Sequence, residues 1–514
     1  MAHSIVWFKR DLRVSDHAPL WHASRLGPVT CLYIIEPAVW SAPDAATQHY
    51  KFVQESLADL KNDLAAMGLQ LHILFGEATE SLSKLYALKH FDGLYSHQET
   101  GNDITYQRDR DVARWCKARE VGWHQYQQFG VIRGPHNRNQ WQSSWESFFR
   151  EHRLKPPVGA TDSGVSTLTI EWPKPSTFNL DPHDPPKRLN GGSRKAWATL
   201  HSFLEDRSAQ YRGGISSPLS ATTACSRLSA YLSWGCISMK EVVQNTRDHL
   251  ANSPTVSQQQ AKGLRAFISR LYWHCHFIQK LEDEPTLEFQ DLHPGYRGLR
   301  NDWQEDYFEA LKAAKTGWPM VDASVMMLRE KGWLNFRMRA MLVSVAAYPL
   351  WLDWPKVGHW LATQFLDYEP GIHWSQMQMQ SGTTGINTAR IYNPIKQAQD
   401  HDPSGRFVRQ WLPALKQIPD AWIFEPWRMP ENIQQLARIS VGHDITVPIV
   451  DLTLATRQAK ARFYERRNEP KVRAGKASIV EKHASRKRPV GHTSRSKTKD
   501  IRSNSQQLTL DLFS

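Results

Sequence analysis

The chain has 514 residues and a formal net charge of +13, and 40% of its residues are hydrophobic and 22% charged. This length leaves room for two or three domains, and the composition is that of a globular protein. No apolar run of about 18 residues occurs, which excludes a membrane-spanning helix. Charge begins at Lys9, too early for a signal peptide, so we expect a cytoplasmic protein.

The cysteines are few and scattered. The chain has five of them, Cys31, Cys116, Cys225, Cys236 and Cys275, and no two form a C-x-x-C pair. This pattern indicates a reducing compartment and argues against a zinc finger or a four-cysteine iron–sulfur cluster. We expect free buried thiols and no bound metal.

Most of the positive charge lies at the C-terminal end. Residues 457–514 contain 16 lysines and arginines against 5 acidic residues, a net charge of +11, which leaves +2 for the first 456 residues. Such a segment is typical of an arm that binds nucleic acid and also of a solvated, disordered end. The net charge therefore suggests that the protein binds nucleic acid, but it does not indicate a binding surface on the first 456 residues.

The first part of the chain alternates short β-rich apolar runs with helical patterns. Strands are expected at Ser4–Phe8, Val29–Ile35 and Leu69–Phe75, with a weaker one at Asp92–Ser96. Thr47–Met67 has apolar residues at helical spacing. This alternation with short loops predicts an α/β domain built on a doubly wound parallel sheet.

The rest of the chain divides by composition. Seven prolines between Pro156 and Pro186 predict an extended linker. Beyond it helical periods dominate, which predicts an all-α domain, and the last residues are too polar and basic to predict a fold. The expected organisation is an α/β domain over 1–135, a linker over 136–195, a helical domain over 196–467 and a basic disordered tail over 468–514.

Small hydroxyl residues stand at the start of a helical pattern in Ala224–Ser238. Free backbone N–H groups at a helix start, with hydroxyl donors beside them, can bind a phosphate or a pyrophosphate. The alternative is an ordinary helix N-cap, which this stretch alone favours.

Later motifs carry a resemblance to a known family. Lys315–Ala323 and Gly332–Arg339 resemble the photolyase/cryptochrome family, the flavoproteins that use blue light to repair pyrimidine dimers in DNA or to signal. Val6–Arg13 resembles the family's N-terminal strand and turn, and Trp411–Pro413 and Glu425–Trp427 resemble its closing helices. The resemblance covers residues 4–467, in order.

The resemblance implies a helical domain that holds FAD in a folded conformation. It also implies an N-terminal domain able to hold a second antenna chromophore of the folate or deazaflavin type. Arg339 and Asp367 match the ion pair beside the flavin ring, for which the alternative is an ordinary buried salt bridge. The residues expected to bind FAD are Tyr211, Cys225, Ser226, Arg227, Leu228, Ser229, Arg337, Arg339, Asp367, Glu369 and His373.

The expected substrate pocket departs from the family pattern. The family's lesion-facing glutamate falls on Arg270, three residues before Trp273, and its asparagine and methionine fall on Phe336 and Ala340. The paired histidines of the (6-4)-photoproduct repair enzymes are absent from residues 334–340. Trp273 remains as the expected stacking wall for extruded bases.

The tryptophan chain that reduces photoexcited FAD in the family is also altered. Trp354 matches its middle member, and Trp303 is the expected outer member across an uncertain gap. The position nearest the flavin falls on Met377, whose thioether is a poor substitute for indole. We expect either slow photoreduction or a route through Trp374, and a local gap could instead restore Trp374 to the nearest position. His373 falls on the residue that faces flavin N5.

The C-terminus resembles the short peptide by which bacterial repair and replication proteins dock onto the sliding clamp. Its glutamine amide suits backbone hydrogen bonds, and its leucine and phenylalanine side chains suit an apolar groove. The alternative is the end of an amphipathic tail. The residues concerned are Gln507, Leu508, Leu510, Leu512 and Phe513.

These observations favour a DNA photolyase that acts through reduced FAD on cyclobutane dimers rather than (6-4) photoproducts. The alternative is a cryptochrome-type photoreceptor on the same fold. A plain nucleic-acid-binding module with a vestigial flavin site does not account for Arg339 and Asp367. The expected partner is UV-damaged DNA, and the expected state is a monomer in the bacterial cytoplasm, associated with the nucleoid.

Overall fold

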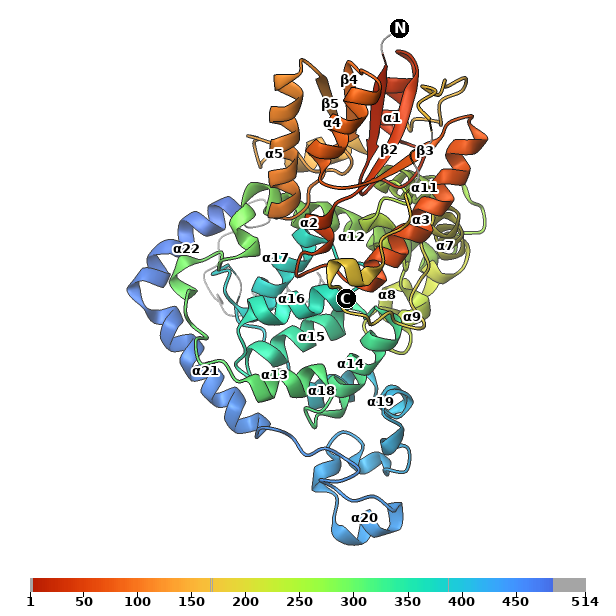
Figure 1. Ribbon diagram of the computed structural model, residues 1–514. Helices are drawn as coiled ribbons and strands as arrows, with labels where there is room; N and C mark the ends of the chain where they lie inside the picture. Colours follow the sequence, from red (N-terminus) through yellow and green to blue (C-terminus); the bar gives the residue numbers. More distant parts are fainter. Residues whose placement is uncertain (1–2, 167, 169, 387, 484–514) are drawn as a thin grey trace, which may run out of the picture.

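The computed structural model describes residues 3–483, except 167, 169 and 387. A sheet domain lies above a larger helical domain in Figure 1. The sheet has five parallel strands in the order β3-β2-β1-β4-β5. The strands are β1 (Ser4–Phe8), β2 (Val29–Ile35), β3 (Leu71–Phe75), β4 (Gly93–His97) and β5 (Gly122–Tyr126).

Helices cover both faces of the sheet, which confirms the predicted doubly wound fold. The side chains of β1 alternate between two separate cores, with Val6 and Phe8 in one and Ile5 and Trp7 in the other. Both β1 and β2 are buried along their whole length, as expected of central parallel strands. The helices of this part are α1 (Ala18–Ser24), α2 (Pro37–Trp40), α3 (Thr47–Ala66), α4 (Ala78–Leu88) and α5 (Asp103–Ala118).

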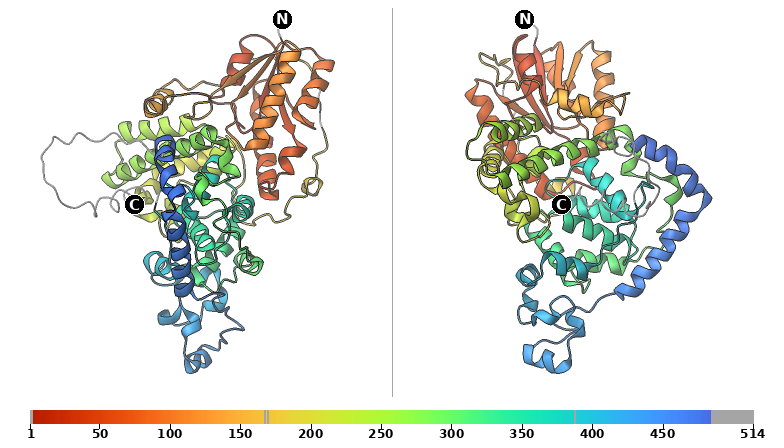
Figure 2. Two further views of the ribbon diagram at one scale, coloured as in Figure 1. Left: turned by 90° about the vertical axis from the view of Figure 1, so that its left-hand side faces the viewer. Right: turned by 180° about the vertical axis from the view of Figure 1, so that it is seen from behind.

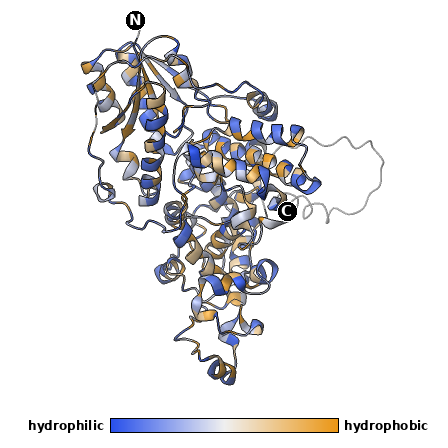
Figure 3. Ribbon diagram, turned by 90° about the vertical axis from the view of Figure 1, so that its right-hand side faces the viewer, coloured by the Kyte–Doolittle hydropathy of each residue, from blue (hydrophilic) through white to orange (hydrophobic). Residues whose placement is uncertain are grey.

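The second domain is helical, as predicted. Its outer helices carry alternating hydrophobic and hydrophilic stripes (Figure 3), the pattern of helices with one buried face. The helices of this domain are α7 (Ser193–Glu205), α8 (Tyr211–Gly214), α9 (Ala221–Ala224), α10 (Ser229–Ser233), α11 (Met239–Asn252), α12 (Gln258–Asp283), α13 (Glu305–Lys312), α14 (Pro319–Lys331), α15 (Phe336–Ala347), α16 (Trp354–Gln364), α17 (Pro370–Ser381), α18 (Pro394–His401), α19 (Arg406–Trp411), α20 (Glu431–Ala437), α21 (Leu452–Asn468) and α22 (Pro470–His483). None of these described helices is long and apolar enough to cross a membrane.

Helices α12 and α17 cross at the centre of this domain. A Cβ atom on Gly371 would lie 2.6 Å from the Cα atom of Ile278, closer than real Cβ contacts. Only glycine allows the two backbones to approach so closely. This crossing brings residues of α12 and α17 to the same cavity.

Two segments differ from the sequence prediction. The expected linker contains α6 (Trp141–Phe148), because Trp141 and Trp145 pack into the core of the helical domain. The expected disordered tail begins with α22, because Val472 packs on Tyr296 and its neighbours in a small apolar cluster. Helices α21 and α22 run along the outside of the helical domain (Figures 1 and 2).

The carboxyl ends of the strands face the helical domain, and side chains cross between the two. Arg10, just after β1, pairs with Glu369 at 3.3 Å and stacks over the Trp234 ring. The Tyr368 hydroxyl donates to Asp44 Oδ2 at 2.6 Å. The sheet domain is therefore joined to the loop that precedes α17.

Candidate active site

A cavity of about 470 Å³ lies inside the helical domain, walled mainly by α12, α15 and α17. This volume falls in the range of about 300–1,000 Å³ that small-molecule and cofactor sites occupy. Its walls combine aromatic and aliphatic side chains with six lysines and arginines and two carboxylates. The basic residues are Arg227, Arg270, Lys280, Arg337, Arg339 and Arg390, and the acidic ones are Asp367 and Glu369.

The loop between α9 and α10 forms one end of the cavity. Ser226 and Ser229 line it, and Arg227 adopts a left-handed backbone conformation with φ of 64°. That conformation is unfavourable for a non-glycine residue and is typical of ligand-binding loops. The Arg227 guanidinium lies 3.7 Å from the centroid of the Trp333 ring. Burial lowers the pKa of Arg227 to about 10. Nη1 of Arg227 is buried and has no hydrogen-bond partner within the described residues.

Arg339 and Asp367 form the expected ion pair on the cavity wall. The distance from Arg339 Nη2 to Asp367 Oδ2 is 2.9 Å, and Arg339 Nε donates to the Leu334 carbonyl at 2.7 Å. Although burial opposes it, the Arg339 guanidinium holds the pKa of Asp367 below its ordinary value. Asp367 Oδ1 is buried without a hydrogen-bond partner in the described part of the chain.

These features fit FAD. The cationic end near Ser226 and Arg227 suits a pyrophosphate. The buried, unsatisfied atoms of Arg227 and Asp367 would be costly unless a bound group completed their hydrogen bonds. The apolar walls suit an aromatic ring system. The cavity therefore has the size and the donor set that the cofactor needs.

His373 is held as a neutral ring. Its Nε2 atom lies 2.9 Å from the Gly358 carbonyl oxygen, which can only accept, so Nε2 carries the proton. Burial lowers the pKa of His373 to about 3. The ring thus lines the cavity with Nδ1 unprotonated. Beside it, burial raises the pKa of Glu369 to about 7, against the opposing effect of Arg10.

One face of α12 forms the wall expected to meet the substrate. Arg270, Trp273, Phe277 and Lys280 stand on it at spacings of three, four and three residues. The Trp273 and Phe277 rings lie 5.9 Å apart between their centroids. The Arg270 guanidinium lies near the Tyr211 hydroxyl, whose pKa is raised by burial and lowered in part by this arginine.

Most residues predicted to bind FAD or substrate line this one cavity. They are Tyr211, Cys225, Ser226, Arg227, Ser229, Arg337, Arg339, Asp367, Glu369, His373, Arg270, Trp273, Phe336 and Ala340. Leu228 does not, because its side chain is fully buried in a hydrophobic cluster. The clamp-like residues 507–513 lie outside the described residues.

The residues expected to form the tryptophan chain are only partly brought together. Met377 lines the cavity, and Trp374 lies one turn away on the continuous helix α17, outside the cavity lining. Trp374 contacts the Trp354 ring at a centroid distance of 5.9 Å and the His373 ring at 4.8 Å. Trp303 instead contacts Phe308 at 5.0 Å, and no ring contact joins it to Trp354 among the described side chains.

Several cavity residues escaped the sequence prediction. Three of them, His276, Phe277 and Lys280, follow Trp273 on α12, where helical spacing from Arg270 and Trp273 could have indicated them. Trp333 and Asn335 lie inside the motif Gly332–Arg339 but were not singled out as site residues. Gln376 and Gln380 stand at helical spacing from His373 on α17, which could have indicated them. Ile386, Arg390 and His483 come from distant segments, with no sequence signal that we can identify.

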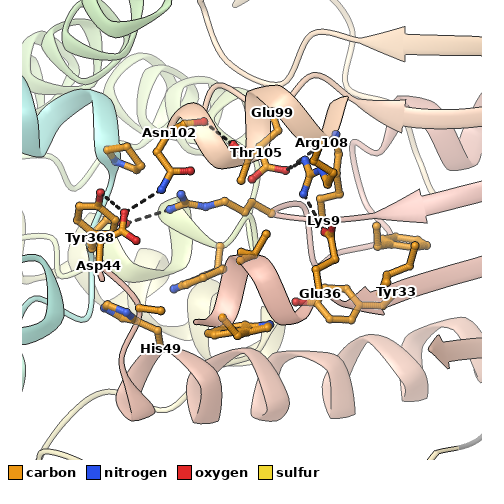
Figure 4. A pocket seen from close by; sticks show the side chains of 18 of the residues that line it. Lys9, Tyr33, Glu36, Asp44, His49, Glu99, Asn102, Thr105, Arg108 and Tyr368 are labelled. Carbon is orange, nitrogen blue, oxygen red and sulfur yellow. Dashed lines mark hydrogen bonds and ion pairs between the residues drawn. The ribbon is translucent and has the colours of Figure 1, made fainter. Parts of the chain in front are cut away.

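A second, smaller pocket lies where the sheet meets the helical domain (Figure 4). It opens at the carboxyl ends of β1 and β4, the switch point where parallel sheets commonly bind ligands. Its volume is only about 80 Å³. Arg108 lies on its wall, with ion pairs to Glu36 at 2.9 Å and Glu99 at 2.6 Å. The second antenna chromophore of the folate or deazaflavin type stays a prediction.

Asp11, His17 and His97 are the one group of potential metal ligands within the part of the chain described. His17 Nε2 and His97 Nδ1 lie 2.9 and 2.7 Å from Asp11 Oδ2. His17 Nδ1 accepts the backbone N–H of Leu20, so its proton sits on Nε2 and is donated to Asp11. Hydrogen bonds account for this cluster.

Comparisons with known proteins agree with this geometry. Residues 4–138 match the DNA photolyase family model, and residues 267–465 match the FAD-binding domain of DNA photolyase. A deoxyribodipyrimidine photo-lyase of Alkalihalophilus pseudofirmus is 24% identical, with 89% of this chain and 97% of that protein covered. A cryptochrome DASH of Gloeobacter violaceus is 25% identical, with 87% and 93% covered.

Solved structures show the same fold. A class III photolyase from Agrobacterium tumefaciens superposes with a TM-score of 0.79 at 24% identity, over 91% of this chain and 98% of the other. A Synechocystis cryptochrome superposes with a TM-score of 0.80 at 22% identity, over 90% and 99%. With both family models matched in order along the chain, and the ion pair and cavity in place, the protein is a flavoprotein of the photolyase/cryptochrome family.

Proposed function

We propose that this protein is a light-driven DNA repair enzyme, a deoxyribodipyrimidine photo-lyase that splits cyclobutane pyrimidine dimers. The observation that carries the proposal is the charge of the cavity. Its six basic and two acidic lining residues leave four positive charges in excess, and burial keeps His276 and His373 neutral. The two phosphates of FAD neutralise only part of this excess, so the cavity favours a second anionic occupant such as DNA.

When bound and reduced, FAD supplies the electron that opens the dimer and takes it back afterwards. The protein binds and orients the partners. Ser226, Ser229 and Arg227 hold the pyrophosphate, while Arg339, fixed by Asp367, places a cation beside the ring system. His373, kept neutral, offers an acceptor without adding charge. Trp273 supports the extruded bases and excludes water from the cavity.

We propose that electrons reach the cavity through Trp354 and Trp374. The two rings are in contact, and Trp374 touches His373 on the cavity wall. Trp354 Nε1 donates to Asp291 Oδ1 at 2.7 Å, and a carboxylate there stabilises a positively charged indole. Trp303 is not part of this route in our proposal, since it contacts Phe308 instead.

We further propose that FAD is the sole light-absorbing group and that the sheet domain has lost its antenna site to the Arg108 ion pairs. The protein acts as a monomer on damaged DNA in the bacterial nucleoid. Residues 507–513 would bring it to the sliding clamp. Deleting them should abolish co-elution with the clamp and leave repair unchanged, and co-elution without these residues would refute that assignment.

The second candidate is a cryptochrome-type photoreceptor. It is favoured by Arg270, which replaces the glutamate that faces the lesion in the family. An arginine can donate to pyrimidine carbonyl groups but cannot accept from their N–H groups. Relatives named as cryptochromes share the fold at similar identity.

Blue-light repair of an oligonucleotide with a single cyclobutane dimer distinguishes the two. The reduced protein should restore the undamaged strand in the light and not in the dark, assayed on single and double strands. Light-dependent repair of a (6-4) photoproduct, without repair of the cyclobutane dimer, would identify the (6-4) photoproduct as the substrate instead. No repair of either lesion, with normal FAD content, would refute the enzyme and favour the photoreceptor.

A further inference from the structure

The cavity wall on α12 includes residues beyond those that the resemblance assigns to FAD. Arg270 and Lys280 bracket the rings of Trp273 and Phe277 on one helix face, with the Lys280 ammonium 5.5 Å from the Phe277 ring centroid. Trp273, Phe277 and Lys280 are all half-buried at the cavity surface. Aromatic platforms flanked by cations are typical of surfaces that bind single strands of nucleic acid.

Lys280 occupies a site rich in positive charge. Burial lowers its pKa to about 8, and the Arg138 guanidinium adds to the effect. Lys280, Arg138 and His483 all act to lower the pKa of His276, which burial brings to about 3. These groups come from α12, from α22 and from the segment before α6, so three parts of the chain meet at this point.

The nearby carboxylates are engaged elsewhere. Glu284 pairs with Lys482 of α22, and Glu282 pairs with Arg133 at 3.0 Å. Asp283 accepts from Gln279 at 2.8 Å. No carboxylate lies within ion-pair distance of Lys280 Nζ in the described part of the chain. A half-buried lysine without a counter-ion keeps part of the cost of removing its charge from water, and an anion that binds there offsets that cost.

We propose that this end of the cavity is a binding subsite for the DNA backbone, in which Lys280 holds a phosphate of the damaged strand and Phe277, beside Trp273, supports one of its bases. The subsite deepens the proposed function, on which it rests. It gives Lys280, a cation of the α12 wall, a ligand of opposite charge. It also assigns a ligand to two residues that the family motifs do not mark.

Binding to a fluorescein-labelled single strand with one cyclobutane dimer tests the subsite. We would measure the dissociation constant of the full-length, FAD-loaded protein in the dark, by anisotropy, across a range of salt concentrations. The variants are Lys280→Gln, Lys280→Arg and Phe277→Leu. Lys262→Gln is the matched control, because Lys262 is exposed on the same helix and does not line the cavity.

Loss of one phosphate contact lowers the slope of log affinity against log salt by about 0.7 for a single strand. Lys280→Gln should therefore weaken binding about eightfold at roughly 50 mM salt and about threefold at roughly 200 mM. Lys280→Arg should retain the wild-type slope, as should Lys262→Gln. Phe277→Leu should weaken binding about fivefold or more without changing the slope.

Two results would overturn the subsite. One is a Lys280→Gln slope equal to that of Lys262→Gln. The other is loss of FAD from Lys280→Gln on gel filtration, which would assign the lysine to the cofactor. Binding is measured in the dark and does not depend on repair. A lowered salt slope for Lys280→Gln would therefore support the subsite even if the protein repaired neither lesion. Repair with an unchanged slope would instead refute the subsite and leave the enzyme proposal intact.

Discussion

Replacing Asp367 by asparagine would remove the partner of Arg339 and leave a cation uncompensated in the flavin cavity. At the observed separation of 2.9 Å, Coulomb's law with an effective dielectric constant of about 20 gives about 6 kcal/mol for the pair. The cost of burying both charges offsets part of this, and removing one member of a buried pair typically costs about 3–5 kcal/mol. Because the Arg339 side chain is 24% exposed, we expect the lower end, about 3 kcal/mol.

Thermal unfolding of the cofactor-free protein at neutral pH measures this loss. For domains of this size 1 kcal/mol shifts Tm by about 2–4 °C, so Asp367→Asn should melt about 6–12 °C lower. Asp111→Asn is the control, because it breaks only the exposed pair with Arg114 and should cost less than about 1 kcal/mol. An Asp367→Asn variant as stable as the control would refute the assigned strength of the pair.

The pH dependence of the difference gives a second check. The pKa of Asp367 is lowered in the folded state, so its contribution is fully present above the unfolded value of about 3.9. It is lost as the pH falls through the lower, folded value. The stability of wild type and variant should therefore converge in acid. A difference that grows as the pH falls would contradict the direction of the shift.

Four further predictions concern the redox route and the sheet domain. Trp374→Phe should strongly slow the light-driven reduction of bound FAD, measured by its absorption under blue light. Trp303→Phe should leave the rate of reduction unchanged. Equal rates in the two variants would refute the proposed route. Gly358→Ala would place a Cβ atom 2.5 Å from the Trp374 ring. It should therefore lower Tm and slow the photoreduction of FAD together. A wild-type Tm and a wild-type photoreduction rate would contradict this and show that the ring has room to move. Arg108→Ala should cost about 3–5 kcal/mol, because it leaves Glu36, Glu99 and Asp109 without their shared partner. A spectrum of the purified protein should show flavin bands only, and a second chromophore would contradict the proposed loss of the antenna site.

The sheet shows which parts of the fold a sequence can predict. Ser4–Phe8 and Val29–Ile35 were predicted with their observed bounds, because central parallel strands carry continuous apolar runs. Strand β5 was missed, since Gly122–Tyr126 lies at the sheet edge, is half-buried and carries polar residues. Helix α22 was missed because only a few of its residues, such as Val472, pack on the domain.

The site was predictable where a motif carries it. Arg339 and Asp367 fell on a recognisable pattern, and the structure brings them together. Lys280 carries no such motif. Helical spacing from Trp273 could have indicated its place on the cavity wall, but not the basic groups around it, because Arg138 and His483 are far away in the sequence. Trp374 and Met377 lie on the same continuous helix α17, and of the two only Met377 lines the cavity. The local gap in the match to the family, which would place Trp374 nearest the flavin, stays a prediction.

The contacts between the domains limit how the protein can be engineered. Arg10 donates to the carbonyl groups of Ser233 and Tyr368 at 2.8 and 3.0 Å, and Gly235 leaves no room for a side chain against the backbone of Asp11. A chimera that took its sheet domain from a relative would have to carry a matching arginine and a matching loop before α17. Without them it would leave Glu369 buried and unpaired at the edge of the flavin cavity. A chimera joined at the domain boundary drawn on the sequence therefore has to preserve these contacts.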